Sequence, residues 1–181
     1  MIEALATTDR LVLRIPRLSD LETCARLLGD YEVAKMLARV AYPYDMEAGK
    51  AYLANAVKNW GDVRIAPELA FHIDREGEMI GCIGFKKLQE TPELGYWLGR
   101  PFWGMGYMHE ALPAAINWVF ENTSHDLIAA EAMTENPASL KVMDRIGFRT
   151  VGEVGCASAA REATLPAIRK ELQRADFVFG L

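Results

Sequence analysis

The sequence holds few of the residues that metal sites and disulfide frameworks need. It has three histidines and three cysteines, and the cysteines (Cys24, Cys82 and Cys156) are odd in number and far apart. This spacing fits no metal-ligand pattern and favours reduced thiols, so we expect no metal and a cytoplasmic location. No run of about 18 apolar residues occurs, so we expect no membrane partner.

Positive charge is also scarce. Lys and Arg total 20 against 25 Asp and Glu, which gives a net charge of −5, and no basic run occurs. Sequence-independent binding to nucleic acid needs a basic surface, so we expect no nucleic-acid partner. Apolar residues make up 51% of the 181 positions, enough for a single core. Residues 1–181 are therefore expected to form one domain.

The sequence does contain an ordered series of strand and helix patterns. Period-two segments predict strands, and apolar residues at three- and four-residue spacing predict helices. The predicted strands cover residues 10–15, 69–74, 79–87, 93–98, 127–133, 148–155 and 165–172. Helices are predicted over residues 21–28, 30–37, 45–60, from about 107, and over 136–147. Residues 156–164 are expected to form a loop and 173–181 a tail, and the whole order indicates an α/β fold with helices on the faces of a mixed sheet.

The most informative stretch joins the strand at residues 93–98 to the next helix. It reads Pro-Phe-Trp-Gly-Met-Gly-Tyr-Met-His-Glu-Ala over residues 101–111. A strand that turns through glycines into a helix exposes backbone N–H groups, and with the helix dipole these suit phosphate or pyrophosphate. The alternative is a tight turn that binds nothing. His109 stands where a dinucleotide fingerprint has its third glycine, and the Gly-Lys-Ser/Thr of a Walker loop is absent.

Two blocks of sequence resemble a known family. The first is Glu-Leu-Gly-Tyr-Trp-Leu with the glycine turn, over residues 93–112, and the second is Asn-Pro-Ala-Ser-Leu-Lys-Val-Met-Asp-Arg-Ile-Gly-Phe over residues 136–148. Together they look like the GNAT superfamily of N-acetyltransferases, in its RimJ/RimL-like branch. The resemblance implies a mixed α+β fold with a central, mostly antiparallel twisted sheet of six to seven strands. It also implies an enzyme that moves an acetyl group from acetyl-CoA to a primary amine by direct attack in a ternary complex.

The same resemblance implies a role for each part of the coenzyme site. The backbone of residues 103–108 would bind the CoA pyrophosphate, and the strand edge at residues 96–99 would pair with the pantetheine arm. The N–H of Leu98 would stabilise the oxyanion, Asn136 would contact pantetheine or cap its helix, and Ser139 would lie near the sulfur. The implied coenzyme-binding residues are Trp97, Leu98, Gly99, Trp103, Gly104, Met105, Gly106, Tyr107, Met108, Asn136 and Ser139.

Three positions depart from the family pattern. Met108 replaces a small residue of the glycine turn, but its side chain can point away from a ligand that meets backbone. Pro113 removes a helix hydrogen bond and is expected to kink or shift the helix. Met143 replaces a tyrosine that many members use to protonate the departing thiolate, so Ser139, water or no group fills that role. This departure keeps open a second class, a non-catalytic acyl-CoA-binding module.

The catalytic candidates are Glu93 and Ser139. Glu93 begins the central strand and could accept a proton from the amine through a water, or could be a solvated charge at the strand end. Ser139 could act on the thiolate, or could only cap and pack. His72 is expected on a sheet face, and Glu110 is expected to be a structural charge in the first helical turn.

The family resemblance also implies that the amine acceptor enters between residues 42–45 and the loop at residues 156–164. Its identity stays open between a protein N-terminus and a small molecule such as a polyamine, an amino acid or an amino sugar. The sequence does not choose between a monomer and a homodimer.

Overall fold

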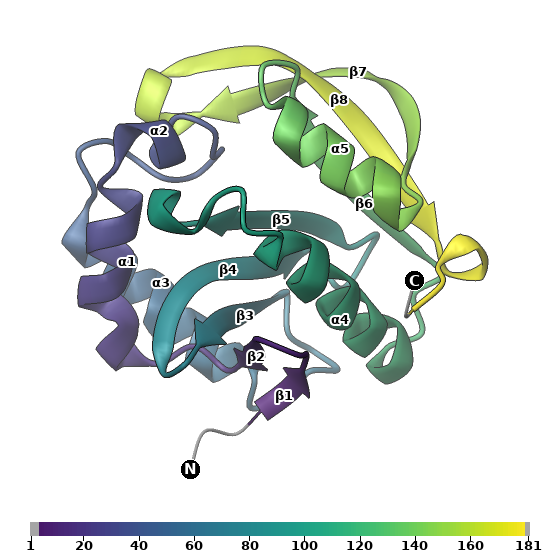
Figure 1. Ribbon diagram of the computed structural model, residues 1–181, viewed down its shortest axis with the longest axis horizontal. Coiled ribbons are helices and arrows are strands. Elements are labelled where there is room, and N and C mark those ends of the chain that lie inside the picture. Colours follow the sequence, from purple (N-terminus) through teal and green to yellow (C-terminus); the bar gives the residue numbers. More distant parts are fainter. Residues whose placement is uncertain (1–3, 180–181) are drawn as a thin grey trace.

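Among the described residues, eight strands form one sheet in the order β1-β2-β3-β4-β5-β6-β8-β7 (Figure 1). The computed structural model describes residues 4–179. The strands are β1 (Ala4–Thr7), β2 (Val12–Arg14), β3 (Glu68–Arg75), β4 (Glu78–Lys86), β5 (Glu93–Leu98), β6 (Leu127–Met133), β7 (Arg149–Ser158) and β8 (Ala163–Gln173). Neighbouring strands are antiparallel except β5 and β6, which run parallel.

Helices cover both faces of this sheet. Figure 1 shows α4 in front of the central strands and α3 behind them. The helices are α1 (Leu21–Leu28), α2 (Tyr31–Ala34), α3 (Met46–Asn59), α4 (Tyr107–Asn122) and α5 (Pro137–Ile146). The predicted α/β fold with helices on both faces is confirmed.

Strand β3 shows why the sheet needs helices on both sides. Its alternate residues Leu69, Phe71 and Ile73 are buried in the core that α4 completes. Ala70 points the other way and is buried in a second core with residues of α1 and α3. Because successive side chains of a strand face opposite ways, a strand that is apolar at nearly every position requires cover on both faces.

The prediction of six to seven strands was wrong. Strand β1, which pairs with β2, was not predicted, because Ala4–Thr7 is too short and too rich in small residues to give a strand pattern. The loop predicted at residues 156–164 was also wrong. There β7 and β8 pair as far as Ser158 and Ala163, so that only residues 159–162 form the tip of the hairpin.

Helix α4 continues through Pro113 from Tyr107 to Asn122 without a break. Pro113 is thus accommodated inside the helix and does not end it. Proline has no N–H to donate to the carbonyl one turn earlier, and here that carbonyl belongs to His109. Both residues line the same surface pocket, so the proline lies on a side of the helix that the core does not cover.

Candidate active site

The glycine turn has the geometry of an anion site. Gly104 and Gly106 both have positive φ angles, 75° and 78°, and Gly106 is the N-cap of α4. A Cβ atom on Gly104 would meet no other atom within 4 Å, so the backbone there is open to a ligand. The Met108 side chain is buried, as predicted. A ligand at the glycine turn would therefore meet the backbone of the first turn of α4. These N–H groups and the helix dipole favour a phosphate group.

Several contacts hold this turn in place. The Trp103 indole Nε1–H donates to the Leu98 carbonyl at 2.8 Å, although its ring is 45% exposed. Arg10 donates through Nη1 to the Met105 carbonyl at 3.1 Å and forms an ion pair with Glu110 at 2.6 Å. Glu110 is thus a structural charge, as predicted. Arg10 lies 95 positions before Met105 in the chain, and no sequence pattern indicated that it would support the turn.

Strands β5 and β6 separate directly before the glycine turn. Their pairing covers only Glu93 with Ala129 and Leu94 with Ala130. On the other side of β5, the Gly99 N–H donates to Ile80 of β4 at 2.9 Å. Because backbone groups alternate along a strand, those of Tyr96 and Leu98 point away from β4, toward the side on which β6 has separated. The free edge includes residues of the segment 96–99, at which the family resemblance implies that pantetheine would pair.

The beginning of α5 borders this free edge. Pro137 is its first residue, and the Asn136 side chain accepts the Ser139 N–H at 3.1 Å, which confirms the predicted cap. The Tyr96 hydroxyl lies 2.7 Å from Ser139 Oγ and donates to the Ser139 carbonyl at 3.1 Å. Burial raises the pKa of Tyr96 to about 12, against the opposing effect of the Ser139 hydrogen bond, so the phenol stays protonated.

Tyr96 was missed as a site residue. It stands between Gly95 and Trp97 with no pattern that places its hydroxyl, and Ser139 is 43 positions away. The one available signal was Met143, which is 1% exposed and buried in the core. Because Met143 stands where many family members have a tyrosine, a search for a tyrosine on a neighbouring element could have found Tyr96 of β5.

Glu93 is the first residue of β5 and, with Leu94, one of its two residues that pair with β6. Its carboxylate is 2.6 Å from Lys87 Nζ and 3.7 Å from Arg169 Nη1. Burial disfavours its ionised form, but the nearby cations, Lys87 first among them, outweigh burial and hold the pKa of Glu93 below its usual range. The residue is therefore an ionised carboxylate over the neutral pH range.

A cavity of about 300 Å³ lies on the face of the sheet that carries α1 and α3. Tyr44 and Asp45 line it, as the expected acceptor entrance requires, but none of residues 156–164 does. The Ala159 N–H donates instead to Ala38 at 3.1 Å, and Arg161 pairs with Glu135. The tip of the β7–β8 hairpin therefore contacts the segment around Ala38 and does not line the cavity.

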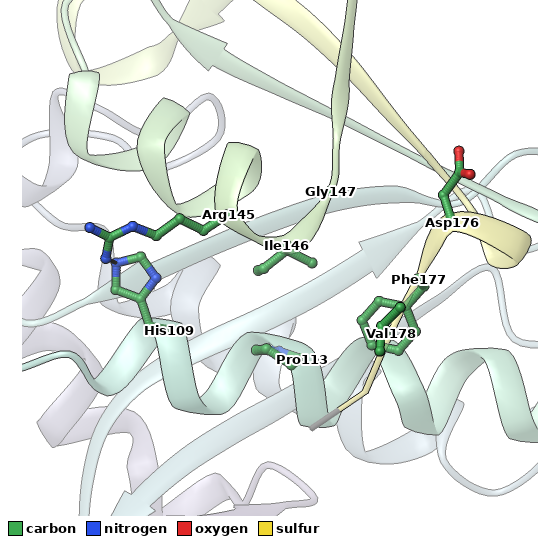
Figure 2. Close-up of a pocket in the computed structure, with 8 residues that line it drawn as sticks. All are labelled: His109, Pro113, Arg145, Ile146, Gly147, Asp176, Phe177 and Val178. Atoms are coloured by element: carbon green, nitrogen blue, oxygen red, sulfur yellow. Dashed lines mark hydrogen bonds between the residues drawn. The ribbon is translucent and has the colours of Figure 1, made fainter. Parts of the chain in front are cut away.

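A second pocket, of about 350 Å³, lies between α4, α5 and the last described residues. In Figure 2 Arg145 extends from α5 toward His109 on α4, and their Nη1 and Nε2 atoms are 3.3 Å apart. Burial and the Arg145 cation lower the pKa of His109, so its ring is neutral at pH 7. Arg145 therefore keeps a permanent positive charge beside His109, in the first turn of α4. His109 is a surface residue beside the turn, as predicted.

Beneath the first cavity, a buried ionic network joins the strands to α1. Arg14 donates to Asp20 through two nitrogens, at 2.9 Å each, and to Asp74 at 3.0 Å. Asp20 also accepts from His72 Nδ1 at 2.7 Å. His72 lies on a sheet face, as predicted, but it is 1% exposed and belongs to this network. Within residues 4–179 no group of three or more His, Cys, Asp or Glu side chains is arranged to hold a metal.

Comparison with known proteins agrees with this architecture. The profile of the acetyltransferase (GNAT) domain matches residues 10–149. The chain is 28% identical over 149 residues to the uncharacterized N-acetyltransferase p20 of Bacillus licheniformis, covering 80% of this chain and 82% of that protein. It is 33% identical over 81 residues to the ribosomal-protein-serine acetyltransferase of Escherichia coli, a match that spans 43% of this chain and 45% of that protein.

Two solved structures share the fold over nearly the whole chain. One is RimL, a ribosomal L7/L12 alpha-N-protein acetyltransferase in complex with coenzyme A, with a TM-score of 0.82, 19% identity and coverage of 96% of this chain and 100% of that one. The other is the microcin C7 self-immunity acetyltransferase MccE in complex with acetyl-CoA and AMP, with a TM-score of 0.78, 18% identity and coverage of 94% and 98%.

The fold and the matched profile define an acetyltransferase. The chain belongs to the GNAT family and is an N-acetyltransferase, and the predicted resemblance to the RimJ/RimL-like branch is confirmed. Among the described residues, no helix combines the length and the apolar character that a membrane crossing requires.

Proposed function

We propose that this enzyme binds acetyl-CoA in the opening between β5 and β6 and transfers the acetyl group directly to a primary amine. The observation that supports this most strongly is the coincidence of three features at one place. Pairing between the two strands stops at Leu94, the glycine turn follows the end of β5, and Ser139 of α5 lies 2.7 Å from the Tyr96 hydroxyl at the opening. An extended ligand with an anionic head fits such an edge and turn.

Each part of the site has a role in this proposal. The turn at residues 103–108 would hold the pyrophosphate through backbone N–H groups, Trp97 to Gly99 would border the pantetheine arm, and Asn136 would position Ser139. Arg145 would attract the negative charge of the coenzyme's adenosine end. When bound, acetyl-CoA supplies an acyl carbon activated as a thioester. The Leu98 N–H points to the same opening and would stabilise negative charge on the carbonyl oxygen.

The acceptor is a primary amine, and a protein N-terminus is supported by two of the related proteins. The E. coli relative is named for a ribosomal-protein serine, and the similar RimL structure is named as an alpha-N-protein acetyltransferase. An α-amine near pKa 7.7–8.0 also needs less help to lose its proton than a lysine side chain near 10.4. The same opening can admit a small-molecule amine.

The experiment that tests the proposal measures CoA released from acetyl-CoA with a thiol reagent, using a panel of amines. The panel contains short peptides, free amino acids, spermidine and glucosamine. Release that depends on both the enzyme and one class of amine supports the proposal. Release at the rate of the amine-free control with every member, from protein that binds acetyl-CoA, would contradict transfer to such amines.

Replacing Glu93 by glutamine tests the proposed route for the amine proton. We propose that Glu93 accepts this proton through a water, and the substitution is expected to lower kcat/KM about tenfold. Because the pKa of Glu93 is below its usual range, the rise in rate near neutral pH should report loss of the proton from the amine. The midpoint of that rise should therefore be the same in the variant and the wild type. The exposed Glu90→Gln variant is the control. An unchanged rate and pH profile for Glu93→Gln would remove Glu93 from the mechanism.

Replacing Tyr96 by phenylalanine tests how the thiolate receives its proton. We propose that Ser139 Oγ donates this proton as it takes another from solvent water, and that Tyr96, a positioning residue, orients the serine hydroxyl from 2.7 Å. The variant keeps the ring and should lose about tenfold in kcat, with the KM for acetyl-CoA changed by less than about twofold. Ser139→Ala should lose as much, and the double variant little more, because both groups serve one proton. Full turnover by Ser139→Ala would contradict this role.

A further inference from the structure

The cavity on the α1/α3 side owes its depth to two glycines. Gly84 of β4 and Gly95 of β5 are paired directly across the two strands, and Ala70 of β3 continues the same row. A Cβ atom on Gly95 would meet no atom within 4 Å, although this residue lies in the middle of a central strand. The floor of the cavity is therefore low because side chains are missing from it, and a side chain at Gly95 would fill it.

The walls of the cavity are mostly apolar and aromatic. They come from α1, from the segment between α2 and α3, from α3 itself and from the neighbouring row of the sheet. The apolar and aromatic side chains are those of Cys24, Leu28, Leu37, Ala38, Val40, Ala41, Tyr44, Ala48, Tyr52, Cys82 and Trp97. A group that enters this space exchanges water for apolar contact, which favours an apolar body.

The polar groups of the cavity disfavour a polycation. Asp45 is the carboxylate among them, and its side chain already accepts the N–H groups of Glu47 and Ala48 as the cap of α3. Arg39 and Lys86 both line the cavity and are positive. His72 also lines the cavity. Burial lowers its pKa, against the opposing effect of Asp20, and so keeps its ring neutral. Arg39 is itself paired with Glu68 at 3.1 Å, so a second ammonium group would find, among the described residues, no carboxylate in the cavity that lacks a partner.

The cavity also adjoins the proposed transfer site. Gly95, Tyr96 and Trp97 line it, and all three follow Leu94, where pairing of β5 with β6 ends. A group seated against Gly95 would thus hold an attached amine beside the free edge of β5.

We propose that this cavity selects the acceptor, and that it favours a primary amine whose neighbouring carbon carries a bulky apolar or aromatic group. This inference rests on the proposed function and adds the class of substrate to it. Such an amine is found at the N-terminus of a peptide that begins with Phe or Leu, and also in a free arylalkylamine. Spermidine, glucosamine and peptides that begin with Ser or Ala fill the cavity poorly or bring charge to it.

The test compares peptides that differ only in the first residue (Phe, Leu, Ala or Ser), with phenethylamine and spermidine beside them. We expect kcat/KM for the Phe or Leu peptide to exceed that for the Ser peptide at least about tenfold, the scale on which apolar pockets discriminate. Phenethylamine turned over as well as the Phe peptide would identify the free amine as a sufficient source. A Ser peptide or spermidine as the best acceptor would overturn the inference.

Gly95→Val tests the cavity itself. The added side chain should fill the floor and lower kcat/KM for the Phe peptide about tenfold, while the Ala peptide changes less than about twofold. Gly152→Val is the matched control, because Gly152 is also a strand glycine whose Cβ would meet no atom within 4 Å. Equal losses for both peptides in Gly95→Val would contradict selection by this cavity.

Two binding measurements separate this inference from the proposed function. Acetyl-CoA affinity of the wild type and of Gly95→Val shows whether the coenzyme site is present and intact in each. Calorimetric binding of the Phe and Ser peptides in the presence of CoA then tests selection without turnover. Absent acetyl-CoA binding by the wild type would contradict the proposed function, whereas bound coenzyme with equal affinity for the two peptides would contradict only the cavity's role.

Discussion

Replacing Gly106 by valine is expected to raise the Kd for acetyl-CoA about 100-fold, or about 2.7 kcal/mol. Gly106 is the N-cap of α4 at a φ of 78°, a conformation that a β-branched residue adopts only under strain. The strain would move the first N–H groups of α4 away from the direction that an anion requires. Because those groups are the proposed pyrophosphate site, the loss should fall on coenzyme binding.

Gly77→Val provides the matched control for this prediction. Gly77 lies in the β3–β4 turn at a φ of 88°, and a Cβ there would meet no atom within 4 Å, whereas one on Gly106 would lie 3.6 Å from Arg10 Nη2. The control should lose a similar amount of stability and keep its affinity for acetyl-CoA, measured by isothermal calorimetry. Equal affinities in the two variants would show that the glycine turn does not bind the coenzyme.

Replacing Asp20 by asparagine is expected to lower the free energy of unfolding by about 3 kcal/mol at pH 7. Asp20 is 6% exposed and accepts from Arg14, from His72 and from the Arg17 N–H. The variant keeps the shape of the side chain but leaves the Arg14 cation, itself 3% exposed, with Asp74 as its remaining partner. Urea denaturation measures the loss, and Asp62→Asn, at a carboxylate in an exposed ion pair, is the control.

The same network predicts how stability depends on pH. Burial opposes ionisation of Asp20, but His72 and Arg14 outweigh it and hold the pKa of Asp20 well below its usual range, so its contribution is present above about pH 4 and lost below. Burial lowers the pKa of His72, so the unfolded chain takes up that proton first, and stability should fall as pH drops below 6.5. A free energy of unfolding that increases as the pH is lowered from 6.5 to 5 would contradict the buried network.

The parts of the fold that could be predicted are those that local sequence determines. The period-two pattern located β3, β4 and β5, and Asn136 before Pro137 located the start of α5, because caps and strand alternation depend on neighbours in the chain. The glycine turn was also found, since positive φ angles at Gly104 and Gly106 need glycine.

The parts that could not be predicted depend on contacts between distant segments. Strand β1 forms because β2 is there to pair with it, and the β7–β8 hairpin extends because its two strands stay paired from Gly152 to Ser158. The contact between Tyr96 and Ser139 depends on how far β5 separates from β6. The acceptor cavity depends on Gly84 and Gly95 meeting across two strands, and each glycine alone resembles an ordinary weak point in a strand.

The most direct test of the central claim is a thermal unfolding titration with acetyl-CoA, CoA and ATP side by side. At about 100 times its dissociation constant, a ligand of the native state should stabilise the enzyme by roughly 2.7 kcal/mol. We expect this shift with acetyl-CoA and with CoA, and little or none with ATP, because ATP lacks the arm that pairs with the edge of β5. No shift with acetyl-CoA, or an equal shift with ATP, would contradict the proposed coenzyme site between β5 and β6.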